Sequence, residues 1–105
     1  MVRVSDEDLL RQLRSGQTDA LAVLFDRHCR LVFSVARRIL RDSGEAEDLM
    51  QEVFLEVHRD AGKFDPARGS VKTWILLCAK QGSLNRLKHL KLRGPSGEPA
   101  AAYEP

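Results

Sequence analysis

Apolar residues recur along most of the chain at spacings of three, four and seven, which is the period of amphipathic helices. Glycine and proline, which interrupt helices, are confined almost entirely to Gly16, Gly44, residues 62–69 and residues 94–105. These breaks leave four segments with helical periodicity. The pattern therefore predicts an all-α fold, a compact bundle of about four helices.

The first two helices are predicted from their caps. Ser5 can accept a hydrogen bond from the next turn, and Gly16 can end the first helix in a left-handed conformation. Thr18 is the next candidate N-cap, and the apolar stripe behind it predicts a long second helix to about Arg41. His28 lies in that stripe, where we interpret it as a satisfied, partly buried histidine rather than a metal ligand.

A third helix is predicted to start after Ser43 and Gly44 and to run to about Asp60. Its apolar stripe must face a core and consists of Ala46, Leu49, Met50, Val53, Phe54 and Val57. The opposite face carries an isolated leucine among polar and charged residues, namely Asp48, Gln51, Glu52, Leu55 and Arg59. This face is either a docking surface or an ordinary solvated helix face.

Residues 64–70 are predicted to form a turn, because Asp65 precedes a proline and Gly69 precedes Ser70, a good N-cap. A fourth helix should run from Val71 to about Arg93. Its first half is apolar nearly all round, so we expect it to insert among the other helices. Its second half mixes cations with amide and hydroxyl groups, which suits phosphates and base edges: Lys80, Arg86, Lys88, Lys91 and Arg93 with Gln81, Ser83 and Asn85.

A glycine inside this helix, Gly82, costs about 1 kcal/mol relative to alanine. It predicts either close approach of another backbone or a ligand, or a small residue at a helix crossing. The chain of 105 residues has room for one domain, which we place at residues 1–93. Residues 94–105 are small, polar and proline-rich and are expected to form a flexible linker or tail.

Charge is distributed in blocks. Residues 42–62 carry −6, from one basic and seven acidic residues, whereas residues 63–93 carry +7, from eight basic and one acidic residue. This asymmetry suggests two partners of opposite charge, with nucleic acid as the candidate for the basic block. Two ordinary solvated faces would give the same charge pattern.

Signals of catalysis, metal binding and membrane insertion are not found. The sequence contains no phosphate-binding loop, zinc motif or nucleophile elbow, so we expect no enzyme activity, no cofactor and no metal site. The longest apolar run has six residues, whereas a bilayer span needs about 20, so no membrane role is expected. Cys29 and Cys78 stand far apart without a leader segment, which indicates a cytoplasmic protein and favours core filler over redox sensors.

Two motifs carry a family resemblance. Ala46-Glu-Asp-Leu-Met-Gln-Glu-Val-Phe54 and Phe64-Asp-Pro-Ala-Arg-Gly-Ser-Val-Lys-Thr-Trp74 resemble region 2 of bacterial extracytoplasmic-function (ECF) sigma factors of the sigma-70 family. The resemblance spans about residues 6–93. It implies a helical domain that binds core RNA polymerase and recognises and melts the promoter −10 element in transcription initiation.

The resemblance also implies roles for single residues. It assigns Asp48, Gln51 and Glu52 to the clamp coiled coil of the polymerase largest subunit, and helical phase adds Leu55 and Arg59. The loop before the last helix would capture a flipped base, and that helix would contact the non-template strand. The residues expected at DNA are Phe64, Asp65, Arg68, Ser70, Lys72, Trp74, Lys80, Gln81, Asn85, Arg86 and Lys88. Whether Trp74 is a wedge beside the strand or a core anchor stays open.

Three residues depart from the family pattern: Gln81 replaces asparagine, Asn85 replaces aspartate and Gly82 replaces a larger residue. The second helical domain that reads the −35 element is not encoded, so we expect an excised domain rather than a stand-alone region 2. An anti-sigma factor is a further partner that the resemblance allows. The alternatives to a sigma factor are a helical adaptor that engages only protein and a regulator of another helical family that binds duplex DNA.

Overall fold

The computed structural model describes residues 3–93, which fold into four α-helices joined by short connections. The helices are α1 (Asp6–Arg14), α2 (Asp19–Leu40), α3 (Ser43–Arg59) and α4 (Val71–Arg93). Two short 3-10 helices, η1 (Ala61–Lys63) and η2 (Pro66–Arg68), lie between α3 and α4. The predicted all-α bundle of about four helices is confirmed, while the linker or tail predicted for residues 94–105 lies outside the described residues.

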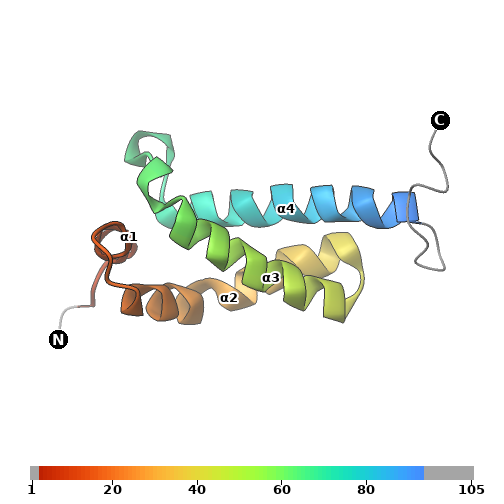
Figure 1. Ribbon diagram of the computed structural model, residues 1–105, viewed down its shortest axis with the longest axis horizontal. Helices are drawn as coiled ribbons and strands as arrows, with labels where there is room; N and C mark the ends of the chain where they lie inside the picture. The colour runs from red at the N-terminus through yellow and green to blue at the C-terminus, as the bar shows by residue number, and fades with distance from the viewer. Residues whose placement is uncertain (1–2, 94–105) are drawn as a thin grey trace.

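The helices form an elongated bundle in which α2 packs against both α3 and α4 (Figure 1). The short α1 lies at one end, packed against α2 and close to η1. The connection that contains η1 and η2 is at the same end, and the last turns of α4 extend toward the other. This arrangement brings the loop before α4 next to the first helix of the chain.

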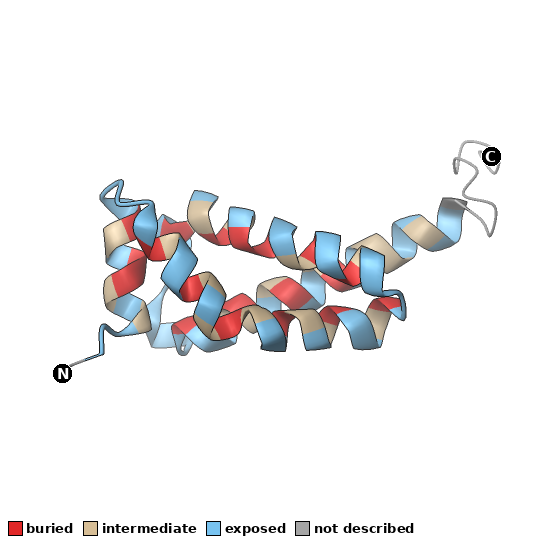
Figure 2. Cartoon of the chain, turned by 90° about the horizontal axis from the view of Figure 1, so that it is seen from below, coloured by how far each residue is buried: buried red, intermediate tan, exposed pale blue. Residues whose placement is uncertain are grey.

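Each helix contributes a buried stripe to one core, coloured red in Figure 2. Along α2 the buried positions recur every four residues: Ala20, Leu24, His28, Val32, Ala36 and Leu40. The buried side of α3 is the predicted stripe, with Ala46, Leu49, Val53, Phe54 and Val57 buried and Met50 half-buried. The rings of Phe25 and Phe54 meet edge to face with centroids 4.9 Å apart, which joins α2 to α3.

The helix ends agree with several predicted caps and differ at two. The Ser5 side chain accepts from the backbone N–H of Asp8, and Gly16 has a φ of +94°. Thr18 is at the N-cap position of α2 as predicted, but its side chain makes no capping hydrogen bond. The third helix begins at Ser43, because the Asp42 side chain caps it by accepting from Glu45 N–H.

The first half of α4 does not insert among the other helices as expected. Only one side is buried, at Val71, Ile75 and Ala79, whereas Leu77 is 57% exposed. The helix therefore lies on α2 and α3 as an outer member of the bundle. Within residues 3–93, no helix has both the length and the apolar character needed to cross a bilayer.

Candidate functional site

The predicted docking face on α3 is accessible along its length. Its five residues, which we call the α3 face, are all exposed: Asp48, Gln51, Glu52, Leu55 and Arg59. Leu55 is 63% exposed, the largest value among the exposed large apolar side chains of the described chain. Arg59 also pairs with its neighbour Asp60, which lowers the pKa of the Asp60 carboxyl through their hydrogen bond.

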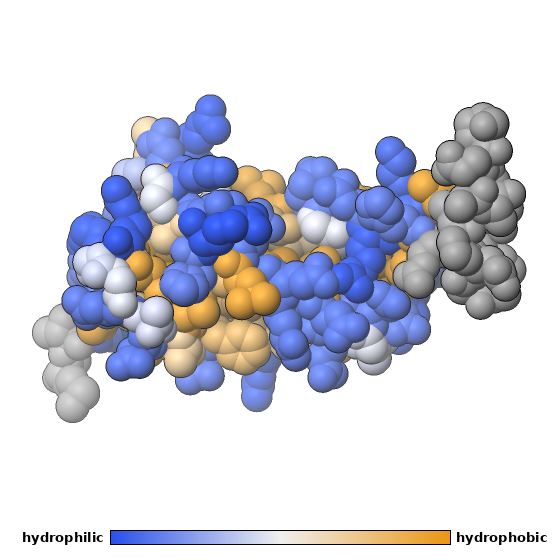
Figure 3. Space-filling view, viewed as in Figure 1, coloured by the Kyte–Doolittle hydropathy of each residue, from blue (hydrophilic) through white to orange (hydrophobic). Residues whose placement is uncertain are grey.

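An apolar hollow borders the α3 face. It has a volume of about 490 Å³ and lies between α2 and α3, where Leu21 and Phe25 come close to Gln51 and Leu55. Figure 3 shows an apolar patch over α2 and α3 with hydrophilic residues around it. The α2 side of this surface was not predicted, because Leu21 and Phe25 belong to an apolar stripe that is typical of an ordinary core.

The loop between α3 and α4 is held by short side-chain contacts. The Asp65 carboxylate accepts from Ala67 N–H at 2.9 Å and so caps η2. Gly69 has a φ of +132°, a conformation that residues with a Cβ rarely adopt. Ser70 then caps α4, since its hydroxyl oxygen accepts from Thr73 N–H at 3.1 Å. These contacts define the path of the backbone on both sides of Gly69.

The loop and the first turns of α4 enclose a hollow of about 160 Å³, which we call the loop pocket. Of the predicted DNA-binding residues it contains Phe64, Asp65, Arg68, Ser70 and Trp74. The rings of Phe64 and Trp74 have centroids 5.8 Å apart and are tilted by 51°. Trp74 is half-buried, so the same ring packs against the core and lines the pocket. Aromatic rings beside polar groups suit a nucleobase.

The remaining predicted DNA-binding residues lie along α4 outside the loop pocket. Four of them are exposed on the surface of this helix: Lys72, Lys80, Gln81 and Lys88. Asn85 is also exposed but borders a second hollow, of about 420 Å³, between α3 and α4. The basic residues of α4 are thus spread along the length of the helix and do not form a single cluster.

Arg86 has two carboxylate partners that no spacing in the sequence indicates. Its guanidinium donates to a carboxylate oxygen of Glu45 at 2.7 Å and to one of Glu52. The hydrogen bond to Glu45 is the main cause that raises the pKa of Arg86, against a lowering by burial. Arg86, which was expected to contact DNA, is therefore paired with Glu52, which was expected to contact polymerase. This pair links α4 to α3.

Gly82 lies at the crossing of α4 with α3. A Cβ at this position would be 3.3 Å from Cδ2 of Leu49, closer than an ordinary van der Waals contact. The approaching group is a side chain, which confirms the interpretation as a small residue at a helix crossing and not the close approach of a backbone.

The first helix is fastened to α2 by an ionic cluster. The Asp6 carboxylate accepts from Arg27 Nη1 at 2.9 Å and contacts Nε2 of His28 at 2.7 Å. His28 is 8% exposed, so it is the satisfied buried histidine that the sequence predicts. Burial alone would raise the pKa of Asp6, but the hydrogen bonds from Arg27 and His28 outweigh it and hold that pKa below its usual value.

This cluster predicts a loss of stability in acid. Because the folded-state pKa of Asp6 is lowered, its contribution is present above the unfolded pKa of about 3.9 and is lost as pH falls through the folded pKa. Asp6→Asn should therefore destabilise the protein at pH 7, and the difference from wild type should shrink below about pH 4. Urea unfolding followed by circular dichroism measures this, and a difference that stays constant with pH would contradict the role of Asp6.

The two cysteines are free and half-buried. Burial, with a smaller contribution from Glu56, raises the pKa of Cys78 to about 12, so its thiol stays protonated near neutral pH. Among residues 3–93, no three His, Cys, Asp or Glu side chains are grouped so that they could hold a metal ion.

Comparisons with known proteins identify a family for this chain. The chain matches the family described as sigma-70 region 2 over residues 24–93. It is similar to the ECF RNA polymerase sigma factor SigK of Mycobacterium ulcerans, with 39% identity over 80 residues, which cover 76% of this chain and 43% of the relative. It is also 38% identical over 85 residues to SigK of Mycobacterium bovis, covering 80% and 46%. The chain thus spans less than half the length of these relatives, and no solved structure matches it.

Proposed function

Because the chain belongs to the sigma-70 region 2 family, we propose that it acts in transcription initiation by binding core RNA polymerase and by recognising and melting the promoter −10 element. The observation that supports this most directly is the separation of two surfaces. The α3 face is acidic and exposed, while the loop pocket and α4 are aromatic and basic. A protein that acts on RNA polymerase works in the cytoplasm, so the cytoplasmic location inferred from the sequence is part of this proposal.

The α3 face and the adjoining hollow are proposed to bind the clamp coiled coil of the polymerase largest subunit. Asp48, Gln51 and Glu52 offer oxygen acceptors to basic side chains of that partner, and Leu55 and Arg59 extend the contact. The hollow beside Leu55 can accept an apolar side chain, which gives the interface a desolvated centre. An anti-sigma factor that competes with polymerase would use the same surface.

The loop pocket is proposed to hold one base flipped from the −10 element, stacked against Phe64 or Trp74. Lys72, Lys80, Gln81, Asn85 and Lys88 would then follow the non-template strand along α4. Arg86 is the exception, because its guanidinium already has two carboxylate partners, and we assign it to holding α4 against α3. This arrangement assigns no catalytic step to the chain.

Removing the base-binding groups should weaken strand binding. We expect Phe64→Ala/Arg68→Gln to reduce affinity for a fluorescent single-stranded −10 oligonucleotide about tenfold, since stacking of one base contributes about 1–3 kcal/mol. Fluorescence anisotropy measures the affinity. Phe33→Ala/Arg37→Gln removes the same two side-chain types from α2 and serves as the matched control.

Two results would favour another function. Stronger binding to duplex DNA than to the single strand would support a duplex-binding regulator. Unchanged strand binding after Lys80→Glu/Lys88→Glu would support a helical adaptor that engages only protein. The family membership does not favour either alternative.

A further inference from the structure

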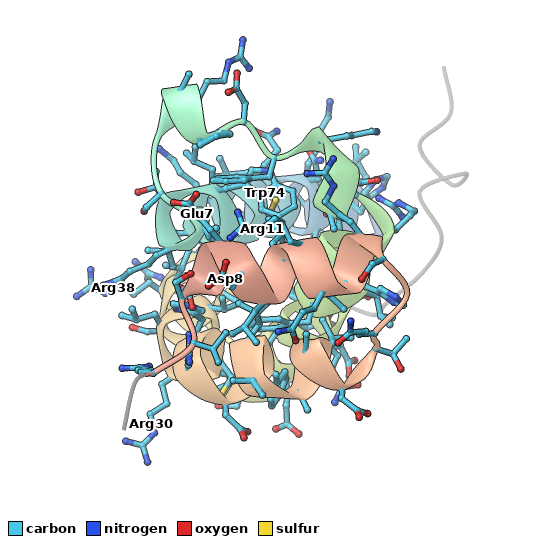
Figure 4. The ribbon with its side chains drawn as sticks, turned by 90° about the vertical axis from the view of Figure 1, so that its left-hand side faces the viewer. Glu7, Asp8, Arg11, Arg30, Arg38 and Trp74 are labelled. Carbon is cyan, nitrogen blue, oxygen red and sulfur yellow. The ribbon has the colours of Figure 1, made fainter. Side chains whose placement is uncertain are left out.

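One face of α1 borders the loop that follows α3. Glu7, Leu10, Arg11 and Arg14 stand at positions i, i+3, i+4 and i+7, so they share this face. Together with Phe64 and Pro66 they line a small hollow of about 90 Å³, which we call the α1 hollow. Figure 4 shows Glu7 and Arg11 on the side of α1 that faces Trp74.

The α1 hollow and the loop pocket adjoin each other. Phe64 lines both the loop pocket, of about 160 Å³, and the α1 hollow, of about 90 Å³. The two hollows come from distant parts of the sequence, because the first is built by the loop and α4 and the second by α1 and the loop. A single-stranded nucleic acid with a base in the loop pocket would have its backbone close to this junction.

The chemistry of the α1 hollow differs from that of the loop pocket. Its volume of about 90 Å³ is smaller than that of the loop pocket, about 160 Å³, so it suits a phosphate group better than a nucleobase with its sugar. Its charged lining residues are two arginines, Arg11 and Arg14, and one carboxylate residue, Glu7. Guanidinium groups bind phosphate oxygens with charge-assisted hydrogen bonds.

Both arginines can reach a ligand at little cost. Arg14 forms no ion pair within the described part of the chain. Arg11 pairs with Asp8, but their side chains are 63% and 49% exposed, and exposed pairs of this kind contribute little to stability. A phosphate could therefore replace Asp8 as the partner of Arg11.

The helix that carries these arginines is firmly placed. Leu9, Leu10 and Leu13 are buried in the core, and Asp6 is bonded to Arg27 and His28 of α2. The backbone of α1 is thus fixed relative to the loop, while both arginine side chains are exposed. Because α1 is already rigidly placed, the entropic cost of binding is lower.

We propose that α1 is part of the nucleic-acid site, and that Arg11 and Arg14 bind the phosphate next to the base held in the loop pocket. This inference rests on the proposed function, because it needs a single strand in the loop pocket. It adds a third element, the first helix of the chain, to the loop and α4. The carboxylate of Glu7 repels the bound phosphate and so lowers the affinity.

The test compares variants of the full chain in which charged side chains are replaced by glutamine. Arg11→Gln/Arg14→Gln keeps helix propensity and removes both cations, and fluorescence anisotropy with the single-stranded −10 oligonucleotide is measured between about 50 and 200 mM salt. We expect weaker binding and a salt slope, log K against log salt, that is smaller by about 0.7 for each phosphate that the variant no longer neutralises. Glu7→Gln should strengthen binding.

Arg37→Gln/Arg41→Gln is the matched control, because both residues are exposed near the end of α2 that lies away from α1. Equal weakening by this control would show a general charge effect and overturn the inference. A wild-type affinity and slope for Arg11→Gln/Arg14→Gln, with binding lost in Phe64→Ala/Arg68→Gln, would overturn the role of α1 alone. Retained binding in Phe64→Ala/Arg68→Gln would instead overturn the proposed function of the loop pocket.

Discussion

Asp48→Lys/Glu52→Lys is expected to abolish association with core RNA polymerase in a pull-down with purified components. Both side chains are exposed on the α3 face, and in the variant Arg86 would still have Glu45 as a partner that links α4 to α3. The double variant places two cations where the proposed partner offers basic groups, and like charges across an interface cost several kcal/mol. A loss of at least roughly 100-fold in affinity, about 2.7 kcal/mol, is the expected size.

Glu52 also pairs with Arg86, and the experiment has to separate the two roles. Arg86→Ala breaks the same bridge but leaves the carboxylates of Asp48 and Glu52 available. This variant should therefore still bind polymerase. Circular dichroism checks that every variant remains helical. If Arg86→Ala lost polymerase as completely as the lysine variant, the bridge and not the α3 face would be responsible.

Leu24→Ala is expected to destabilise the protein strongly, by about 2–5 kcal/mol in urea unfolding. Leu24 is fully buried in the stripe on α2, so its removal leaves a cavity that the neighbouring helices fill only in part. A domain of this size has a total stability of about 5–15 kcal/mol, so the variant should unfold at a clearly lower urea concentration than the wild type.

Leu55→Ala makes the same chemical change on the α3 face. Leu55 is 63% exposed. Its replacement should therefore change the free energy of unfolding by no more than about 0.5 kcal/mol. The polymerase affinity should nevertheless fall, since this leucine borders the apolar hollow. Equal destabilisation by the two substitutions would show that Leu55 supports the fold, and an unchanged polymerase affinity would contradict its place in the interface.

Periodicity predicted most of the fold because each helix buries one side. The stripes on α2 and α3 are regular enough to identify the core residues directly. The same reasoning was wrong for Leu77, since an apolar run carries no periodicity that shows which side remains exposed. The start of α3 was also misjudged, because Asp42 caps the helix one residue before the Ser43-Gly44 pair.

The candidate sites were predicted less completely than the fold. The exposure of the α3 face follows from helical phase, which is a local property. The bridge from Arg86 to Glu45 joins residues 41 positions apart, and its formation depends on how α3 crosses α4. Contact of α1 with the loop likewise requires the tertiary arrangement, and no spacing in the sequence indicates it.

The contact of Gly82 with Leu49 has a consequence for chimeric proteins. A methyl group at position 82 would stand only 3.3 Å from the leucine, so the bare backbone lets the two helices sit closer than bulkier residues would allow. Transplanting α4 from a relative with a larger residue here would push the helices apart and stretch the bridge of Arg86. Such a graft should therefore exchange Leu49 for a smaller partner at the same time.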